Sequence, residues 1–112
     1  MKNILLSLIL VLLSSALFAH GSHGPINDKK AVSLSLMMVD QLTQQDVGLG
    51  FGKLDASWGG LSRRNAKISK QDDDYFIVSV TNKSGDKTLY VLVSRGGDIY
   101  DVNFTGKFDG LD

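Results

Sequence analysis

The feature that most constrains the fold is a series of short segments after Asn65 in which apolar residues alternate with polar ones. A period of two is typical of β-strands that bury one face. The turns between these segments contain only a few residues, and such turns join antiparallel neighbours because parallel strands need a long crossover. The pattern therefore predicts a four-stranded antiparallel meander with strands at residues 66–70, 75–81, 87–94 and 99–104.

One face of the predicted sheet is apolar, and it comprises Phe76, Val78, Val80, Leu89, Val91, Val93, Tyr100, Val102 and Phe104. A single sheet of this kind needs a second layer to cover that face. A helical stripe supplies the largest remaining apolar surface, and it comprises Ala31, Leu34, Met38 and Leu42, widened by Val32, Leu36 and Val39. We therefore expect an α+β fold, a two-layer sandwich in which an N-terminal helix packs on the meander.

The helix is expected to run from about Asp28 to Gln44. Asn27 can cap its first turn, and the carboxylate of Asp28 suits the positive end of the helix dipole. The segment from 46 to 61 is rich in glycine and is the least regular part of the chain.

Within that glycine-rich segment, Asp55 is expected to cap one helical turn that ends at Trp58. Trp58 is expected to fill the core, because a single aromatic residue among aliphatic ones usually packs inside. The hairpin loop at 82–86 holds Gly85, which can take a positive φ. The three aspartates at 72–74 are adjacent in a tight turn, so they favour a solvated turn over a calcium site.

The N-terminus has the three parts of a secretory signal. Lys2 is basic, residues 4–13 are apolar apart from one serine, and small residues lead up to Ala19. The apolar run is shorter than the roughly 20 residues that span a bilayer. We predict a signal peptide at 1–19 that is cleaved after Ala19, with cleavage after Ala16 as the alternative, and a periplasmic location without membrane attachment.

Composition narrows the function classes. The chain has no cysteine, so the mature domain must be held by packing, without the disulfides that are common in small secreted domains. Its 12 basic residues are balanced by 12 acidic ones, and no basic stripe stands out, which argues against a nucleic-acid partner. No thiol nucleophile or catalytic motif is present, and both histidines precede the first predicted element. We therefore predict a protein that is not an enzyme and needs no cofactor.

His20 and His23 are the one candidate metal site in the sequence. After cleavage at Ala19, His20 would offer its α-amine and imidazole, with the imidazole of His23 nearby. Such nitrogen ligands suit Cu(II), Ni(II) or Zn(II). The alternative is that residues 20–26 form a solvated, flexible arm, because glycines surround both histidines and no apolar pattern anchors them.

The order of helix and meander resembles a PepSY-type domain, a small extracytoplasmic module of bacteria. The residues that carry the likeness are an aromatic-rich strand at 74–80, an aliphatic strand at 89–93 and a glycine turn at 97–99. The resemblance implies contact with a protein or peptide. The acidic residue that PepSY domains have before the turn glycines is replaced here by Ser94 and Arg95, so no ligand contact carries over at that position.

The chain also resembles a group of short, uncharacterised periplasmic proteins through two motifs, His-Gly-Ser-His-Gly-Pro-Ile at 20–26 and Gly-Lys-Leu-Asp-Ala-Ser-Trp at 52–58. The predicted organisation is a signal peptide at 1–19, a histidine arm at 20–26, one domain at 27–105 and a frayed tail at 106–112. The predicted function is a binding or regulatory module that contacts a periplasmic protein or peptide at a sheet edge. The alternative is transition-metal binding through His20 and His23.

Overall fold

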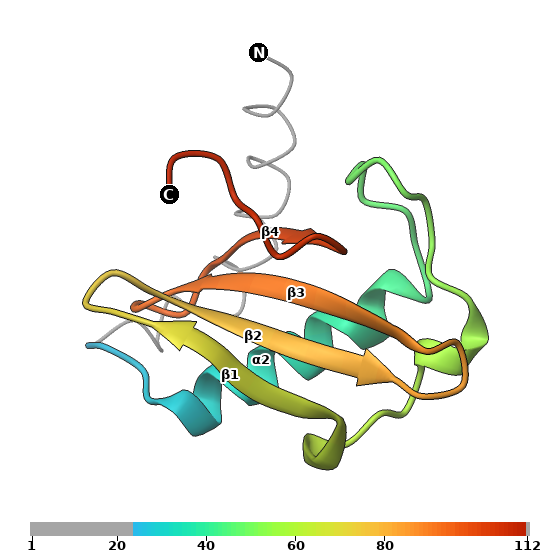
Figure 1. The fold of residues 1–112 in the computed structure, drawn as a ribbon, viewed down its shortest axis with the longest axis horizontal. Coiled ribbons are helices and arrows are strands. Elements are labelled where there is room, and N and C mark those ends of the chain that lie inside the picture. Colours follow the sequence, from blue (N-terminus) through green and yellow to red (C-terminus); the bar gives the residue numbers. More distant parts are fainter. Residues whose placement is uncertain (1–23, 112) are drawn as a thin grey trace.

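One helix lies across one face of a four-stranded antiparallel sheet in the structure, a computed structural model that describes residues 24–111 (Figure 1). The strands follow the order β1-β2-β3-β4, and the predicted α+β sandwich is confirmed. The elements are α2 (Asp28–Leu42), η1 (Ala56–Trp58), η2 (Arg63–Asn65), β1 (Ala66–Gln71), β2 (Tyr75–Asn82), β3 (Lys87–Ser94) and β4 (Ile99–Asn103). The predicted signal peptide, His20, His23 and Asp112 lie outside the described residues.

Helix α2 begins as predicted, because the side chain of Asn27 accepts a hydrogen bond from the backbone N–H of Lys30 at 2.9 Å. It ends at Leu42, two residues earlier than predicted. The backbone N–H of Thr43 bonds to the carbonyl of Asp40, and the Thr43 hydroxyl donates to the same oxygen. Among the residues described, no helix is long and apolar enough to cross a membrane.

The core lies between α2 and the facing side of the sheet, which we call the inner face. The apolar stripe of the helix meets the rows of valine, leucine and phenylalanine from β2, β3 and β4. Trp58 is 4% exposed and belongs to this core, as predicted. Asp55 caps the turn before it, because its side chain accepts the backbone N–H of Ser57.

A β-bulge changes the prediction for β4. Ile99 pairs with Val93 and Asp101 pairs with Leu92, so Tyr100 is an extra residue on its strand. A bulge of this kind bends the strand and leaves one residue out of the ladder. Tyr100 is 53% exposed and Phe104 is 38% exposed, so their predicted place in the buried row is wrong. Ile99 takes the inward position instead.

The hairpin between β2 and β3 also differs from the prediction. Asp86, not Gly85, takes the positive φ, at 54°. An aspartate tolerates this left-handed conformation better than most other side chains.

The turn between β3 and β4 anchors the end of the N-terminal arm. Gly97 has a φ of 98°, and a Cβ there would lie 3.4 Å from Ile26 Cγ2. The backbone N–H of Ile26 donates to the carbonyl of Arg95 at 2.8 Å, and its side chain packs on the core. The prediction of a flexible arm is therefore wrong at Ile26.

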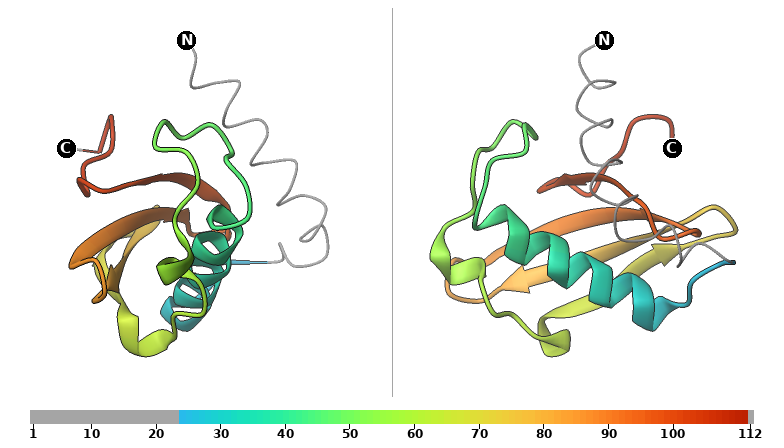
Figure 2. Two further views of the ribbon diagram at one scale, coloured as in Figure 1. Left: turned by 90° about the vertical axis from the view of Figure 1, so that its right-hand side faces the viewer. Right: turned by 180° about the vertical axis from the view of Figure 1, so that it is seen from behind.

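The segment after β4 does not fray as predicted. It turns back on the helix-free side of the sheet, which we call the outer face (Figure 2). Phe108 is 5% exposed and packs with Tyr75, Ile77 and Leu92. Asn103 fixes the turn, because its Nδ2 donates to the carbonyl of Lys107 and its Oδ1 accepts the N–H of Gly106, both at 2.8 Å. We call residues 104–111 the C-terminal strap.

The strap yields a prediction about stability. Replacing Phe108 by alanine removes a buried ring, so Phe108→Ala should lower the free energy of unfolding by about 3 kcal/mol. Tyr100→Ala is the matched control, because it removes a ring that is already half exposed, and its effect should stay under about 1 kcal/mol. Urea denaturation measures both values. Equal effects of the two substitutions would contradict the packing of the strap.

Candidate functional site

A groove on the outer face, between β1 and β2, is bordered by three cationic side chains. Its cavity has a volume of about 260 Å³ and is lined by Arg64, Asn65, Ala66, Lys67, Ser79, Thr81 and Lys83. No carboxylate lines it. Within residues 24–111, no hydrogen bond or ion pair engages the side chains of the three cations. No carboxylate of the described residues therefore forms an ion pair with the cations of this groove.

Each cation is positioned by a different element. Lys67 lies on β1 opposite Ser79 of β2, so its side chain points to the outer face. Lys83 follows β2 in the hairpin loop. Arg64 belongs to η2, which is closed by a capping box between Ser62 and Asn65.

The neighbour of Arg64 fixes η2 to the helix. Arg63 donates from Nη2 to the hydroxyl of Ser33 at 2.5 Å and from Nη1 to the carbonyl of Lys29 at 3.4 Å. Of two adjacent arginines, one is therefore used to attach η2 to α2, and the other is left to border the groove.

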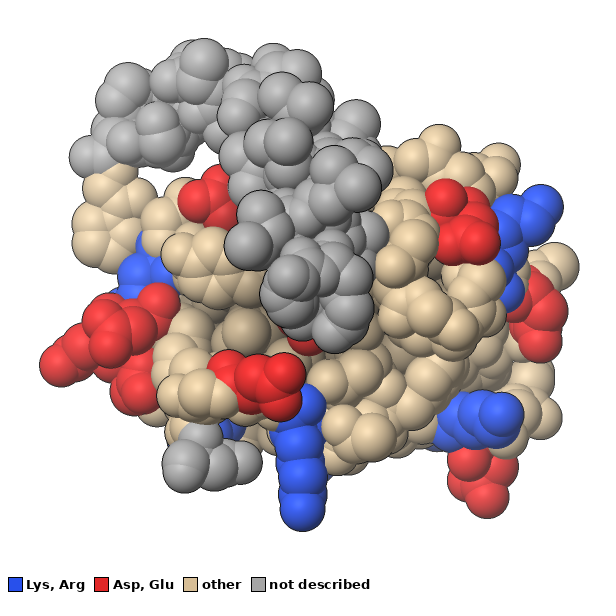
Figure 3. Space-filling view, turned by 90° about the horizontal axis from the view of Figure 1, so that it is seen from above, with Lys and Arg blue, Asp and Glu red and all other residues tan. Residues whose placement is uncertain are grey.

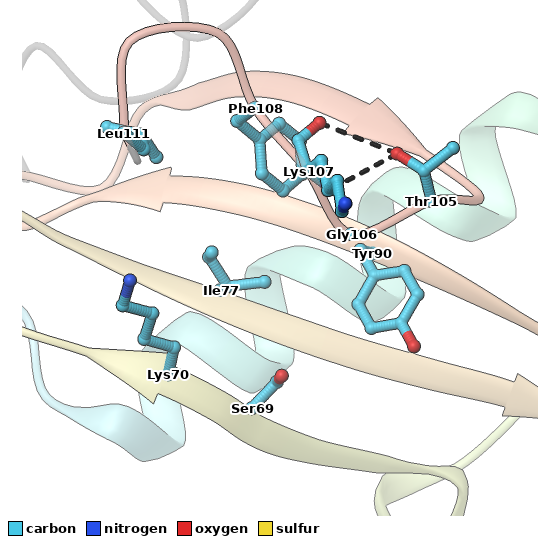
Figure 4. Close-up of a pocket in the computed structure, with 9 residues that line it drawn as sticks. All are labelled: Ser69, Lys70, Ile77, Tyr90, Thr105, Gly106, Lys107, Phe108 and Leu111. Carbon is cyan, nitrogen blue, oxygen red and sulfur yellow. Dashed lines mark hydrogen bonds between the residues drawn. The ribbon is translucent and has the colours of Figure 1, made fainter.

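A second cavity continues the groove under the C-terminal strap. Its volume is about 400 Å³, and it is lined by Ser69, Lys70, Ile77, Tyr90, Thr105, Gly106, Lys107, Phe108 and Leu111 (Figure 4). Ile77 and Ser79 are successive outward-facing residues of β2 and line one cavity each. The two cavities therefore lie end to end along β1, and we call them together the outer groove. Lys70 and Lys107 add two ammonium groups to its border.

The outer groove runs beside a sheet edge. β1 is the first strand in the sheet order and pairs only with β2 among the described strands (Figure 1). An edge strand presents backbone N–H and C=O groups to which another extended chain can pair. A bulge between Ile68 and Lys70 interrupts the regular edge.

A partly buried aspartate lies on the outer face at β4, away from β1. Asp101 on β4 is partly buried, and its pKa is raised, chiefly by burial and further by the nearby Asp109, while the hydrogen bond from the N–H of Val102 acts in the opposite direction. On the face seen from above, acidic and basic side chains are interspersed (Figure 3). The cavity near Arg64 differs from that mixed surface, because all of the charged residues that line it are cations.

The aspartate turn at 72–74 is used structurally. Asp72 Oδ1 accepts the backbone N–H groups of Asp74 at 2.8 Å and Tyr75 at 3.1 Å, which closes the turn into β2. Within residues 24–111, no group of three or more histidine, cysteine or acidic residues is arranged to hold a metal ion. His20 and His23, the predicted metal ligands, lie outside the described residues, and metal binding there stays a prediction.

A family model, described as a family of unknown function (DUF6488), matches residues 1–107. The chain belongs to this family. No curated protein and no solved structure matches it. No similarity therefore assigns a ligand or partner to the outer groove of this DUF6488 member.

Sequence reasoning missed the outer groove. Lys67 and Lys70 lie within the predicted strand at 66–70, and strict alternation would place them on opposite faces; the bulge between Ile68 and Lys70 puts both on the outer face. Arg64 and Lys83 join them only through the fold, because 19 positions separate them in the sequence and the pairing of β1 with β2 brings them together.

The raised pKa of Asp101 predicts a pH effect on stability. Between its unfolded pKa and its raised folded pKa, the native state binds more protons than the unfolded state, so stability falls as pH rises through that range. Asp101→Asn keeps the acceptor for Val102 but cannot ionise. The variant should be more stable than the wild type at neutral pH, and the difference should shrink below pH 4. Thermal unfolding from pH 3 to 7 measures this; a variant that is less stable at pH 7 would contradict it.

Proposed function

We propose that this protein is a non-enzymatic periplasmic module that binds an extended, acidic segment of a protein or peptide in the outer groove, alongside β1. The observation that carries the proposal is the convergence of Arg64, Lys67 and Lys83 without a carboxylate among the lining residues. Cations that border a cavity and have no ion-pair partner attract an anionic partner and raise its association rate.

The shape of the site favours an extended partner. The two cavities follow one strand for most of its length, and the unpaired edge of β1 offers backbone groups that a second strand can use. The bulge in β1 and its lysines suit a controlled pairing, because both features discourage indiscriminate edge-to-edge association.

The groups in the groove also fit this partner. Ser79, Thr81 and Asn65 supply short polar side chains between the cations. The hydroxyls of Thr81 and Thr88 lie 3.1 Å apart, one from each strand, and hold that part of the floor in place. The resemblance of residues 74–102 to PepSY-type domains, which implies protein or peptide contact, supports the same class of partner.

The test uses the mature protein and a fluorescent six-residue peptide that alternates Glu with Val, matching the six residues of β1. The reference peptide carries Gln in place of Glu. Fluorescence anisotropy should show binding of the acidic peptide that is about tenfold tighter than that of the reference, and the difference should shrink as salt screens the charges.

Charge reversal locates the site. Arg64→Glu and Lys67→Glu should each weaken binding of the acidic peptide severalfold, because each replaces an attraction by a repulsion. Lys30→Glu, which changes an exposed lysine on α2, is the matched control and should leave binding unchanged. Equal binding of the two peptides, or equal loss in all three variants, would overturn the proposal. A single-stranded oligonucleotide that binds as tightly at the same residues would also overturn it, since the groove would then select polyanions in general.

A further inference from the structure

A third cavity, which we call the aromatic pocket, is separate from the two cavities of the outer groove. Half of its lining residues belong to the Gly-Lys-Leu-Asp-Ala-Ser-Trp motif at 52–58. Its volume is about 470 Å³, and it is lined by Phe51, Lys53, Leu54, Asp55, Ser57, Trp58, Asn82, Gly85, Lys87 and Phe104. This volume lies within the range of roughly 300–1,000 Å³ that is usual for small-molecule sites. None of these residues lines the outer groove, so the inference does not rest on the function proposed above.

Three aromatic rings form one side of the pocket. Phe104 meets Phe51 edge to face at a centroid distance of 5.2 Å and Trp58 at 6.0 Å. Trp58 is buried, whereas Phe104 remains 38% exposed. Aromatic residues usually bury most of their surface, so a ring held by two others and still open at the pocket offers an apolar surface to a flat ligand.

Polar residues also line the pocket, and a chain of hydrogen bonds fixes them. Asp55 Oδ1 accepts both the hydroxyl and the backbone N–H of Ser57. The Ser57 hydroxyl oxygen accepts Nδ2 of Asn82 at 2.7 Å, and Oδ1 of Asn82 accepts the N–H of Ser84 at 3.0 Å. Asn82 is 2% exposed, so its amide anchors η1 to the β2–β3 hairpin from inside the fold.

Two lysines give the pocket its charge. Lys87 Nζ lies 5.9 Å from the centroid of the Phe104 ring. The two hydrogen bonds from Ser57 lower the pKa of Asp55, and the charge of Lys87 lowers it further, although partial desolvation acts against this. The side chain of Lys53 makes no hydrogen bond or ion pair within residues 24–111. Two ammonium groups against one carboxylate, which already accepts two hydrogen bonds, leave the pocket net cationic.

We infer that this pocket binds an aromatic ring that bears a carboxylate, either a small aryl acid or the C-terminal aromatic residue of a peptide. The ring lies against Phe104, and the carboxylate pairs with Lys87 and Lys53. The combination of a fixed wall, an open aromatic surface and two cations selects this class over neutral aromatic compounds, which gain no ion pair, and over simple anions, which gain no apolar contact.

Trp58 is the only tryptophan of the chain and lines the pocket, so its fluorescence reports binding directly. Phenylacetate should change the Trp58 emission in a saturable manner at millimolar concentration, the range usual for a ligand of this size. Phenylacetamide, which is neutral, and acetate, which lacks the ring, should each bind at least fivefold more weakly. Titration with N-acetylphenylalanine and with its amide tests the peptide form of the ligand.

Variants distinguish ligand binding in the pocket from nonspecific quenching of the Trp58 fluorescence. Lys87→Gln should weaken phenylacetate binding severalfold while leaving phenylacetamide binding unchanged, because only the acid pairs with the ammonium group and Lys53 remains; Lys107→Gln, a change in the outer groove, should have no effect on either ligand. Phe104→Ala should weaken both ligands; cooperative thermal unfolding of each variant shows that the fold persists. Equal affinity for acid and amide, or unchanged affinity in Lys87→Gln, would overturn the inference. Because the acidic peptide of the earlier test contains no aromatic residue, failure of one proposal leaves the other standing.

Discussion

The structure depends on one packing interaction, the burial of the α2 stripe against the inner face of β2 and β3. Val78, Val80, Leu89, Val91 and Val93 are fully buried there. The chain has no cysteine, so no covalent link shares this task. Ser35 of α2 is a polar residue buried in this interface. Its hydroxyl donates to the carbonyl of Ala31 at 2.8 Å, so the buried hydroxyl has a hydrogen-bond partner.

Burial of the inner face leaves the outer face free to take other side chains, because a strand alternates its residues between the two sides. At the β3 side the C-terminal strap covers it with Phe108. At the β1 side it carries lysines, hydroxyls and cavities. The outward residues under the strap are packed, whereas Lys67 on β1 is exposed and can change without disturbing either packed layer.

The sequence predicted what local periodicity determines. The strands start within one residue of their predicted positions, and Asn27, Asp55 and Trp58 have the predicted roles. The sequence-based prediction was wrong where tertiary contacts determine which residues are buried. The bulge at Tyr100 breaks the period of two, and Phe108 is buried only because the chain turns back over β2 and β3, which no local pattern shows. The outer groove was missed for the same reason, since Arg64 borders it from η2 and Lys83 from a loop.

The β2–β3 hairpin contributes residues to both candidate sites. Lys83 in its loop borders the outer groove, and Lys87 just after it borders the aromatic pocket. At its start the loop is held by Asn82, whose buried amide bonds to Ser57 on one side and to the backbone of Ser84 on the other. A buried amide that loses one partner pays the full cost of desolvation, so this connection resists displacement. Asn82 therefore ties the hairpin that carries both lysines to Ser57 of the motif at 52–58, and five residues of that motif also line the aromatic pocket.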